Sequence, residues 1–312
     1  MNPLLVTRVL FVAGLALALG GCATVKRTAV NQLGDALAAG GTTFAADDDP
    51  ELVRAAAPFS LKLMEGLLAE NPRHRGLLLA TASGFTQYAY AFVQQEADEI
   101  ADQDFAAATA LRLRARRLYL RARNYGLRGL DVAHDGFVKN LRAKATDAVC
   151  CATAADVPLL YWTAAAWGAA IALSKDDADL IADQGLIEAL IDRALELDEK
   201  FDHGAIHTFL ITYEMARPGG TDDPAARARK HFERAMELSA AQQVGPLISL
   251  AESVTVRGQN RAEFEALLRR AIAVDADARP EWRLLNLAMQ RRARWLLARA
   301  DDLFLPALKE NP

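Results

Sequence analysis

The sequence predicts an all-α protein, a superhelical stack of degenerate helix pairs with a capping helix at the C-terminal end. Ala and Leu dominate the 312 residues, and 19 Gly and 11 Pro are ordinary numbers, as in helical proteins. Residues 157–174 carry no charge, so a helix there would be apolar on every side and must be buried. From residue 156 onward, similar helix pairs recur along the chain. These three observations favour stacked helices.

The uncharged segment 157–174 is where we expect the centre of the fold. At about 1.5 Å per residue it spans roughly 27 Å, short of the ~20 residues that a bilayer crossing requires. Burial within protein is therefore favoured, with a membrane span as the weaker alternative. Tyr161, Trp162 and Trp167 are suited to filling gaps between its small residues. Asp156 is expected to be the N-cap, and Pro158 suits the first turn.

The N-terminus has the pattern of an export signal. Arg8 precedes an apolar run at residues 9–19, and small residues follow at Gly20 and Gly21. The next residue, Cys22, resembles the lipobox cysteine of bacterial lipoproteins, which implies cleavage of residues 1–21 and acylation of Cys22. An ordinary secretory signal with an incidental cysteine is the alternative. The formal net charge of −4 gives no general attraction to nucleic acid, and three cysteines exclude a disulfide framework.

Residues 22–46 are predicted to form a lipid-anchored tether, followed by an N-terminal helical part at 47–155. The run Asp47-Asp48-Asp49-Pro50 is a strong helix start, because it places acids and a proline at the first turn. Pro58 is expected to kink or divide the helix that follows, and Asn71-Pro72 should end it.

Two long helices are predicted at residues 75–100 and 105–130, and their charges are opposite. The first ends in an acidic patch, whereas the second carries seven arginines. Antiparallel packing would place some arginines beside the acids, and each exposed pair would contribute at most ~1 kcal/mol. The alternative is a basic surface for lipid headgroups or an anionic ligand.

The region 156–312 is predicted to hold the repeats. Segments 157–174, 204–217 and 245–257 pair in turn with 186–199, 224–238 and 261–274, and residues 281–304 form the cap. The second helices end alike, and their equivalent alanines (194, 235 and 271) are 41 and 36 residues apart. Such pairs resemble tetratricopeptide repeats, whose ideal period is 34, and these repeats stack into a curved solenoid.

No motif for catalysis or for a cofactor is present. The chain has no Gly-rich phosphate loop, no Gly-x-Ser-x-Gly elbow and no His-Glu-x-x-His helix. His203 and His207 are four residues apart, but no glutamate lies between them in that pattern and no third ligand is evident. Cys150 and Cys151 are adjacent and lack the Cys-x-x-Cys spacing. We therefore expect no enzyme, no cofactor and no metal.

The aromatic residues offer a different kind of site. Most should be core, as aromatics at helical spacing usually are. The segment 157–174 has no polar face, however, so a subunit partner or an apolar ligand is expected on any side that the repeats do not cover. The candidate ligand or pore residues are Tyr88, Tyr161, Trp162, Trp167 and His207.

Several stretches together resemble the TatT family, the helical lipoprotein component associated with tripartite ATP-independent periplasmic (TRAP) transporters. The stretches that carry the resemblance are YAYAFV at 88–93, DVPLLYWTAAAWG at 156–168, GAIH at 204–207, HFERA at 231–235, RARWLL at 292–297 and DDLF at 301–304.

The resemblance implies tetratricopeptide-like helix pairs and a lipid-anchored body that faces the periplasm. Ala23, in place of an aspartate after the lipidated cysteine, favours the outer membrane over the inner by resemblance to enteric lipoproteins. The family resemblance also implies a homotrimer around a pore or cleft, which docks a periplasmic solute-binding protein and handles a hydrophobic or organic-acid ligand. The family transfers no catalytic residue, and only Cys22 can be assigned by it. The alternative function is a tetratricopeptide-type scaffold lipoprotein that organises an envelope protein complex.

Overall fold

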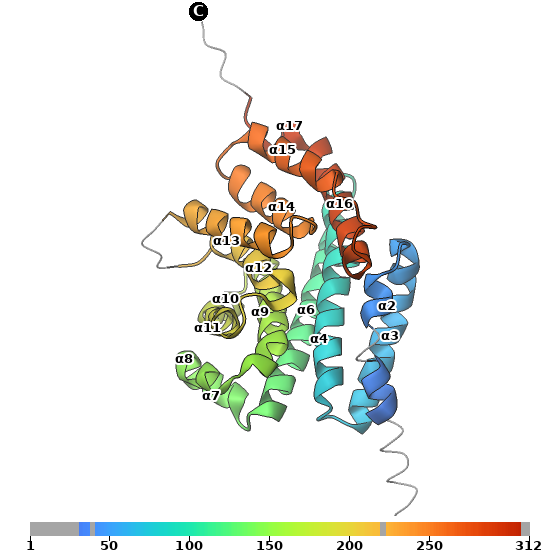
Figure 1. Ribbon diagram of the computed structural model, residues 1–312, viewed down its shortest axis with the longest axis vertical. Coiled ribbons are helices and arrows are strands. Elements are labelled where there is room, and N and C mark those ends of the chain that lie inside the picture. The colour runs from blue at the N-terminus through green and yellow to red at the C-terminus, as the bar shows by residue number, and fades with distance from the viewer. Residues whose placement is uncertain (1–30, 38–40, 219–222, 307–312) are drawn as a thin grey trace, which may run out of the picture.

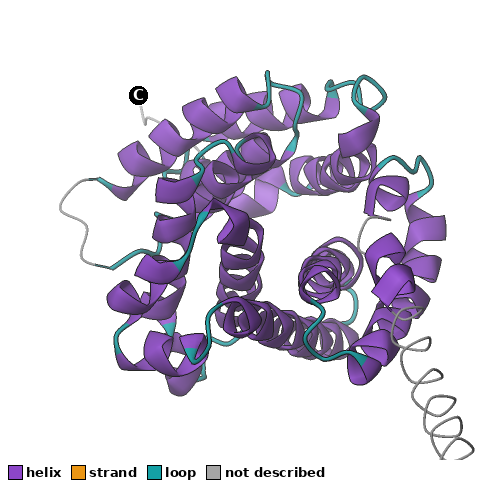
Figure 2. Ribbon diagram, turned by 60° about the horizontal axis from the view of Figure 1, so that its bottom comes forward, coloured by secondary structure: helices purple, strands orange, loops and turns teal. Residues whose placement is uncertain are grey.

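All described residues of the chain are helical or belong to the loops and turns between helices, as Figure 2 shows. The structure, a computed structural model, describes residues 31–37, 41–218 and 223–306. The all-α prediction is thereby confirmed. The export signal and Cys22 lie outside the described residues.

The N-terminal part begins as the local sequence predicts. Its helices are α2 (Gly41–Ala45), α3 (Pro50–Glu70), α4 (Arg75–Tyr88), α5 (Gln95–Glu99) and α6 (Phe105–Ala133). The Asp49 carboxylate caps α3 by accepting hydrogen bonds from the amides of Glu51 and Leu52. Pro58 lies inside α3 but does not divide it, and Asn71 is the C-cap.

The predicted helix at 75–100 contains a π-helical turn. Between α4 and α5, η1 (Ala89–Gln94) is wound as a π-helix, and the three segments pack along α6. The predicted ion pairing between the acidic patch and the arginines of α6 is found only in part. Asp98 contacts Arg112 of α6 at 3.2 Å, whereas other acids of the patch pair with other helices. Glu96 contacts Arg54, and Glu99 contacts Arg291 of the last long helix.

The connection to the central helix consists of α7 (Phe137–Ala143), α8 (Ala145–Ala148) and the 3₁₀ turns η2 (Val149–Cys151) and η3 (Ala154–Asp156). Asp156 occupies the N-cap position of α9, as the sequence predicts, but its side chain makes no capping hydrogen bond to α9 because the 3₁₀ turn η3 precedes the helix directly. Its carboxylate instead accepts hydrogen bonds from the backbone and hydroxyl of Thr153, at 2.8 and 2.9 Å, in a capping box. Arg75 and His134 contact the same carboxylate at 2.5 and 3.1 Å.

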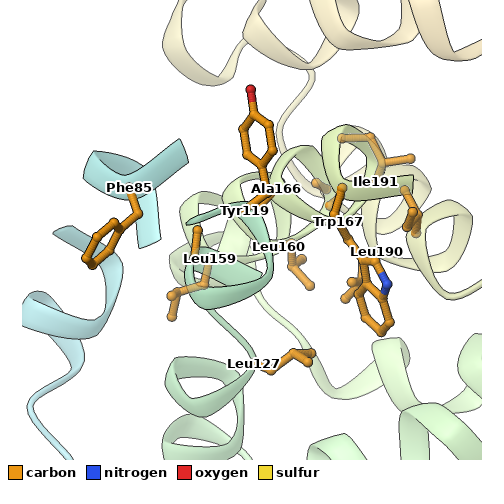
Figure 3. Packing of buried hydrophobic residues seen from close by; sticks show 14 of the residues in the cluster. Phe85, Tyr119, Leu127, Leu159, Leu160, Ala166, Trp167, Leu190 and Ile191 are labelled. Carbon is orange, nitrogen blue, oxygen red and sulfur yellow. The ribbon is translucent and has the colours of Figure 1, made fainter. Parts of the chain in front are cut away.

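The central helix α9 (Val157–Ala172) is buried by other helices of the same chain. It packs against α6, α4, α11 and α12. Figure 3 shows Trp167 of α9 gathered with Leu190 and Ile191 of α11. Among the described residues no single helix is long and apolar enough to cross a membrane. One bent pair of segments, 145–151 and 154–172 at 108°, passes the same test by length and composition.

The predicted pairs after residue 156 are present as packed helices. The remaining elements are α10 (Ala178–Ala182), α11 (Gln184–Leu197), η4 (Phe201–His203), α12 (Ala205–Tyr213), α13 (Pro224–Leu238), α14 (Gly245–Leu250), the π-helical turn η5 (Ala251–Thr255) and α15 (Arg261–Ile272). Helix α9 packs against α11, α12 against α13, and α14 with η5 against α15. A regular tetratricopeptide superhelix stays a prediction.

The C-terminal helices return to the N-terminal ones. After η6 (Pro280–Trp282) come α16 (Arg283–Ala298) and α17 (Ala300–Leu303), and α16 packs against α15 on one side and α2 and α3 on the other. Figure 1 shows α16 beside the first helices of the chain. Helix α2 and the helical residues 31–37, which the sequence assigns to a tether, contact the body through α16 and through Asn71.

A partly buried ion-pair network joins the C-terminal helix α16 to α5 of the N-terminal part and to η5. The side chain of Arg292 is 12 % exposed and contacts Asp98 of α5 at 2.8 Å and Glu252 of η5 at 2.6 Å. Burial alone would lower the pKa of Arg292, but the neighbouring charges, with Glu252 foremost, outweigh it and raise that pKa. Tyr90 of η1 packs against the hydrophobic clusters of both halves. The C-terminal helix α16 is therefore held against the N-terminal helices.

Candidate functional site

A half-buried aromatic cluster forms where α9 faces η4. Most of α9 is buried, but Pro158, Tyr161, Trp162, Ala165 and Ala169 share one partly exposed stripe because they are three or four residues apart. The Tyr161 ring packs edge-on against Trp162 at 5.0 Å and against Phe201 of η4 at 5.4 Å. This stripe is the side of α9 that the other helices leave open.

The backbone of η4 is strained. Asp202 and His203 adopt positive φ angles of 43° and 54°, and Gly204 follows with φ 97°. Such conformations cost non-glycine residues about 1–3 kcal/mol each and are concentrated at functional sites. The strain turns the His203 ring onto Trp282 of η6, with ring centroids 4.9 Å apart. The cluster thus extends from α9 to the start of the C-terminal helix.

The two polar groups of this cluster, the Tyr161 hydroxyl and the Asp202 carboxyl, are both partly desolvated by the surrounding protein. Burial, followed by the charge of Asp202, raises the pKa of the Tyr161 hydroxyl above its ordinary value. Asp202 as a whole residue is exposed, but the protein around its carboxyl desolvates that group and raises its pKa, against the lowering effect of His203. The cluster thus combines aromatic faces with the Asp202 carboxyl, whose charged form is disfavoured by desolvation. This combination suits an apolar ligand with a polar end.

The structure brings two of the five predicted site residues together, Tyr161 and Trp162. The other three lie apart from the cluster. Trp167 has no exposed surface and is flanked by the guanidinium groups of Arg123 and Arg142, with carbons 4.9 and 5.9 Å from its ring. Tyr88 is 9 % exposed and packs on Phe92. A role for any of the five in ligand passage stays a prediction.

His207, the fifth, belongs to a histidine pair. Its Nδ1 lies 2.8 Å from Nδ1 of His231, and its Nε2 lies 3.6 Å from the Glu199 carboxylate. Desolvation and the neighbouring His207 lower the pKa of His231 to about 4. Within the residues that the structure describes, no group of three or more His, Cys, Asp and Glu side chains is arranged to hold a metal.

Sequence reasoning missed the contribution of η4 and η6. Phe201, Asp202 and Trp282 join the cluster only because the loop after α11 takes a left-handed path. Aspartate and histidine before a glycine are among the residues that tolerate positive φ. That weak local signal was the only one available, since the distance between Phe201 and Tyr161 is set by the packing of α9 and α11.

Comparison with known proteins extends over nearly the whole described body. An uncharacterized protein of Treponema pallidum (strain Nichols) is 33% identical over 266 residues, which is 84% of this chain and 82% of that protein. The family described as TRAP transporter T-component matches residues 46–304. The chain therefore belongs to this family of accessory components of TRAP transporters.

Proposed function

We propose that the protein is a non-catalytic accessory of TRAP-type solute uptake that docks a periplasmic solute-binding protein and handles a hydrophobic or organic-acid ligand. The family match over residues 46–304 carries the proposal, because the family is defined by its association with TRAP transporters. We further propose that Cys22 anchors the chain by its acyl groups, facing the periplasm from the outer membrane. A homotrimer is part of the same proposal.

The aromatic cluster supports the ligand-handling part of the proposal. Tyr161 and Trp162 are partly exposed on α9, and Phe201, which directly precedes the strained residues of η4, packs against Tyr161. Partly exposed rings next to a partly desolvated carboxyl would favour the binding of an apolar ligand. These three residues are the proposed ligand contacts.

The partner is tested by affinity capture from periplasmic extract of the native organism. The bait is the mature chain (residues 22–312) with Cys22→Ser, which removes the acylation site. We expect mass spectrometry to identify a TRAP solute-binding protein among the captured proteins. Recovery of other envelope proteins in its place would overturn the docking proposal and favour the scaffold function.

The ligand contacts are tested by mass spectrometry of small molecules and lipids that the purified bait retains. Tyr161→Ala and Trp162→Ala should reduce the retained amount at least fivefold while leaving capture of the solute-binding protein intact. Phe105→Ala is the matched control, since this phenylalanine is 73% exposed on α6, outside the cluster. Equal retention by all three variants would contradict the assignment.

A further inference from the structure

A row of arginines follows the outward face of α6. Arg114, Arg117, Arg121 and Arg128 are exposed, and with Asn124 they are spaced three, four, three and four residues apart, which places them on one stripe of the helix. A shallow pocket of about 370 Å³ opens along this stripe and is lined by Arg117, Leu120, Arg121, Asn124, Tyr125 and Arg128. We call the four arginines the arginine row.

Most of the row lacks a neutralising acid. Arg121 lies 3.6 Å from Glu65, but that carboxylate also contacts Lys62 at 2.6 Å and the Tyr125 hydroxyl at 2.9 Å. Arg114, Arg117 and Arg128 have no carboxylate within 4 Å among the described residues. Since the chain as a whole carries −4, the row is a local positive surface on an acidic protein.

The row ends beside the first described residues of the chain. Arg128 donates to the Pro72 carbonyl at 3.0 Å, and the adjacent Asn71 donates to Asn31, at the start of the described chain, at 2.7 Å. Figure 1 shows this end of the molecule beside α3. Cys22 lies nine residues before Asn31, and nine residues span at most about 30 Å.

From this placement we infer that the arginine row rests on the anionic headgroups of the membrane that anchors the chain. Guanidinium groups bind phosphate oxygens in a bidentate manner, and they attract an anionic surface within about one Debye length, near 8–10 Å. The inference relies on the proposed acylation of Cys22 for the position of the row. It does not depend on ligand handling or on the solute-binding protein.

Vesicle sedimentation tests the inference with the mature chain, residues 22–312, carrying Cys22→Ser. Without acyl chains, binding reports the surface itself, and cooperative unfolding by circular dichroism verifies that each variant is folded. Vesicles contain phosphatidylcholine alone or with 30% phosphatidylglycerol. The test variant is Arg114→Gln with Arg117→Gln and Arg128→Gln. The matched control removes three exposed cations elsewhere, by Lys230→Gln, Arg270→Gln and Arg294→Gln.

We expect binding that requires phosphatidylglycerol and weakens as salt is added. One cation near an anionic surface contributes about fivefold in partitioning, so the test variant should bind at least tenfold more weakly. The control should stay within about twofold of the parent chain. The single charge reversal Arg117→Glu should also weaken binding. It replaces the triple variant in the test if that variant does not fold.

Three results would overturn the inference. One is equal binding to both kinds of vesicle, and another is equal loss in the test and control variants. The third is competition by 10 mM inorganic phosphate that chloride at the same ionic strength does not reproduce, since this would assign the row to a free anion. Capture of the solute-binding protein is measured separately, so either proposal can fail without the other.

Discussion

His207 and His231 hold one proton between their facing Nδ1 atoms. At 2.8 Å one nitrogen donates and the other accepts, which is possible only while at least one ring is neutral. Burial lowers the pKa of both histidines, because a second positive charge there would be poorly solvated. The pair therefore couples the stability of α12 and α13 to pH.

The free energy of unfolding should fall as the pH is lowered from about 6.5 to about 4. The unfolded chain binds protons at the ordinary histidine pKa of 6.5, whereas folded His231 binds one only near 4. Unfolding thus takes up protons across this window and becomes easier as the pH drops. Urea unfolding at pH 7 and pH 5 measures the difference.

His231→Gln is the variant that isolates this effect, because it removes the titrating group and keeps a polar side chain. We expect a smaller stability difference between pH 7 and pH 5 than in the parent. His203→Gln in η4, outside the histidine pair, is the control and should leave the difference unchanged. An unchanged difference in His231→Gln would contradict the assignment.

At the scale of elements, the contact between α6 and α9 depends on glycine. A Cβ added at Gly126 would lie 2.1 Å from Oγ1 of Thr163 and 3.1 Å from its Cβ. Thr163 is fully buried and its hydroxyl donates to the Leu159 carbonyl, so the side chain has no space to move. The glycine therefore permits the close approach of the two helices.

Gly126→Ala should destabilise the protein by about 1–3 kcal/mol, because overpacking outweighs the better helix propensity of alanine. Gly66→Ala in α3 is the matched control, since no atom lies within 4 Å of its added Cβ. That substitution should stabilise the protein by up to about 1 kcal/mol. Chemical denaturation measures both, and a gain in stability for Gly126→Ala would show that the helices are not in close contact.

At the scale of the whole molecule, the closure between the two ends of the chain depends on Arg292. Its guanidinium connects α16 to Asp98 and Glu252, and the separation in sequence from Asp98 is 194 residues. Two π-helical turns, η1 and η5, lie beside this network, and Glu252 belongs to η5. Such turns are often found at functional sites.

Arg292→Met should destabilise the protein by about 1–3 kcal/mol, because the partly buried carboxylates of Asp98 and Glu252 lose their shared partner, although Asp98 keeps Arg112. Hydrogen exchange should accelerate first in α5, η5 and α16, which the network joins. Arg294→Met, two residues on and exposed, should change stability by no more than about 0.5 kcal/mol. Equal exchange rates in the two variants would refute a closing role.

Local sequence signals predicted much of the fold. Asp49 and Pro50 marked the start of α3, Asn71 its end, and the uncharged run at 157–174 the central helix, because capping and burial act within a few residues. The site was harder to predict. Tyr161 and Trp162 were singled out as candidates, whereas Trp167 on the same helix is fully buried, since α11 covers that face.

By itself the sequence determined the all-α class, the boundaries of most long helices and, through short motifs, membership in the family. These depend on residues that are neighbours in the chain or on one helix face. The tertiary structure alone decided which side of α9 stays open, that the His203 ring packs on Trp282, and that α16 meets α2 and α3. The reason is physical: each of these depends on contacts between segments far apart in sequence, where packing overrides local preference.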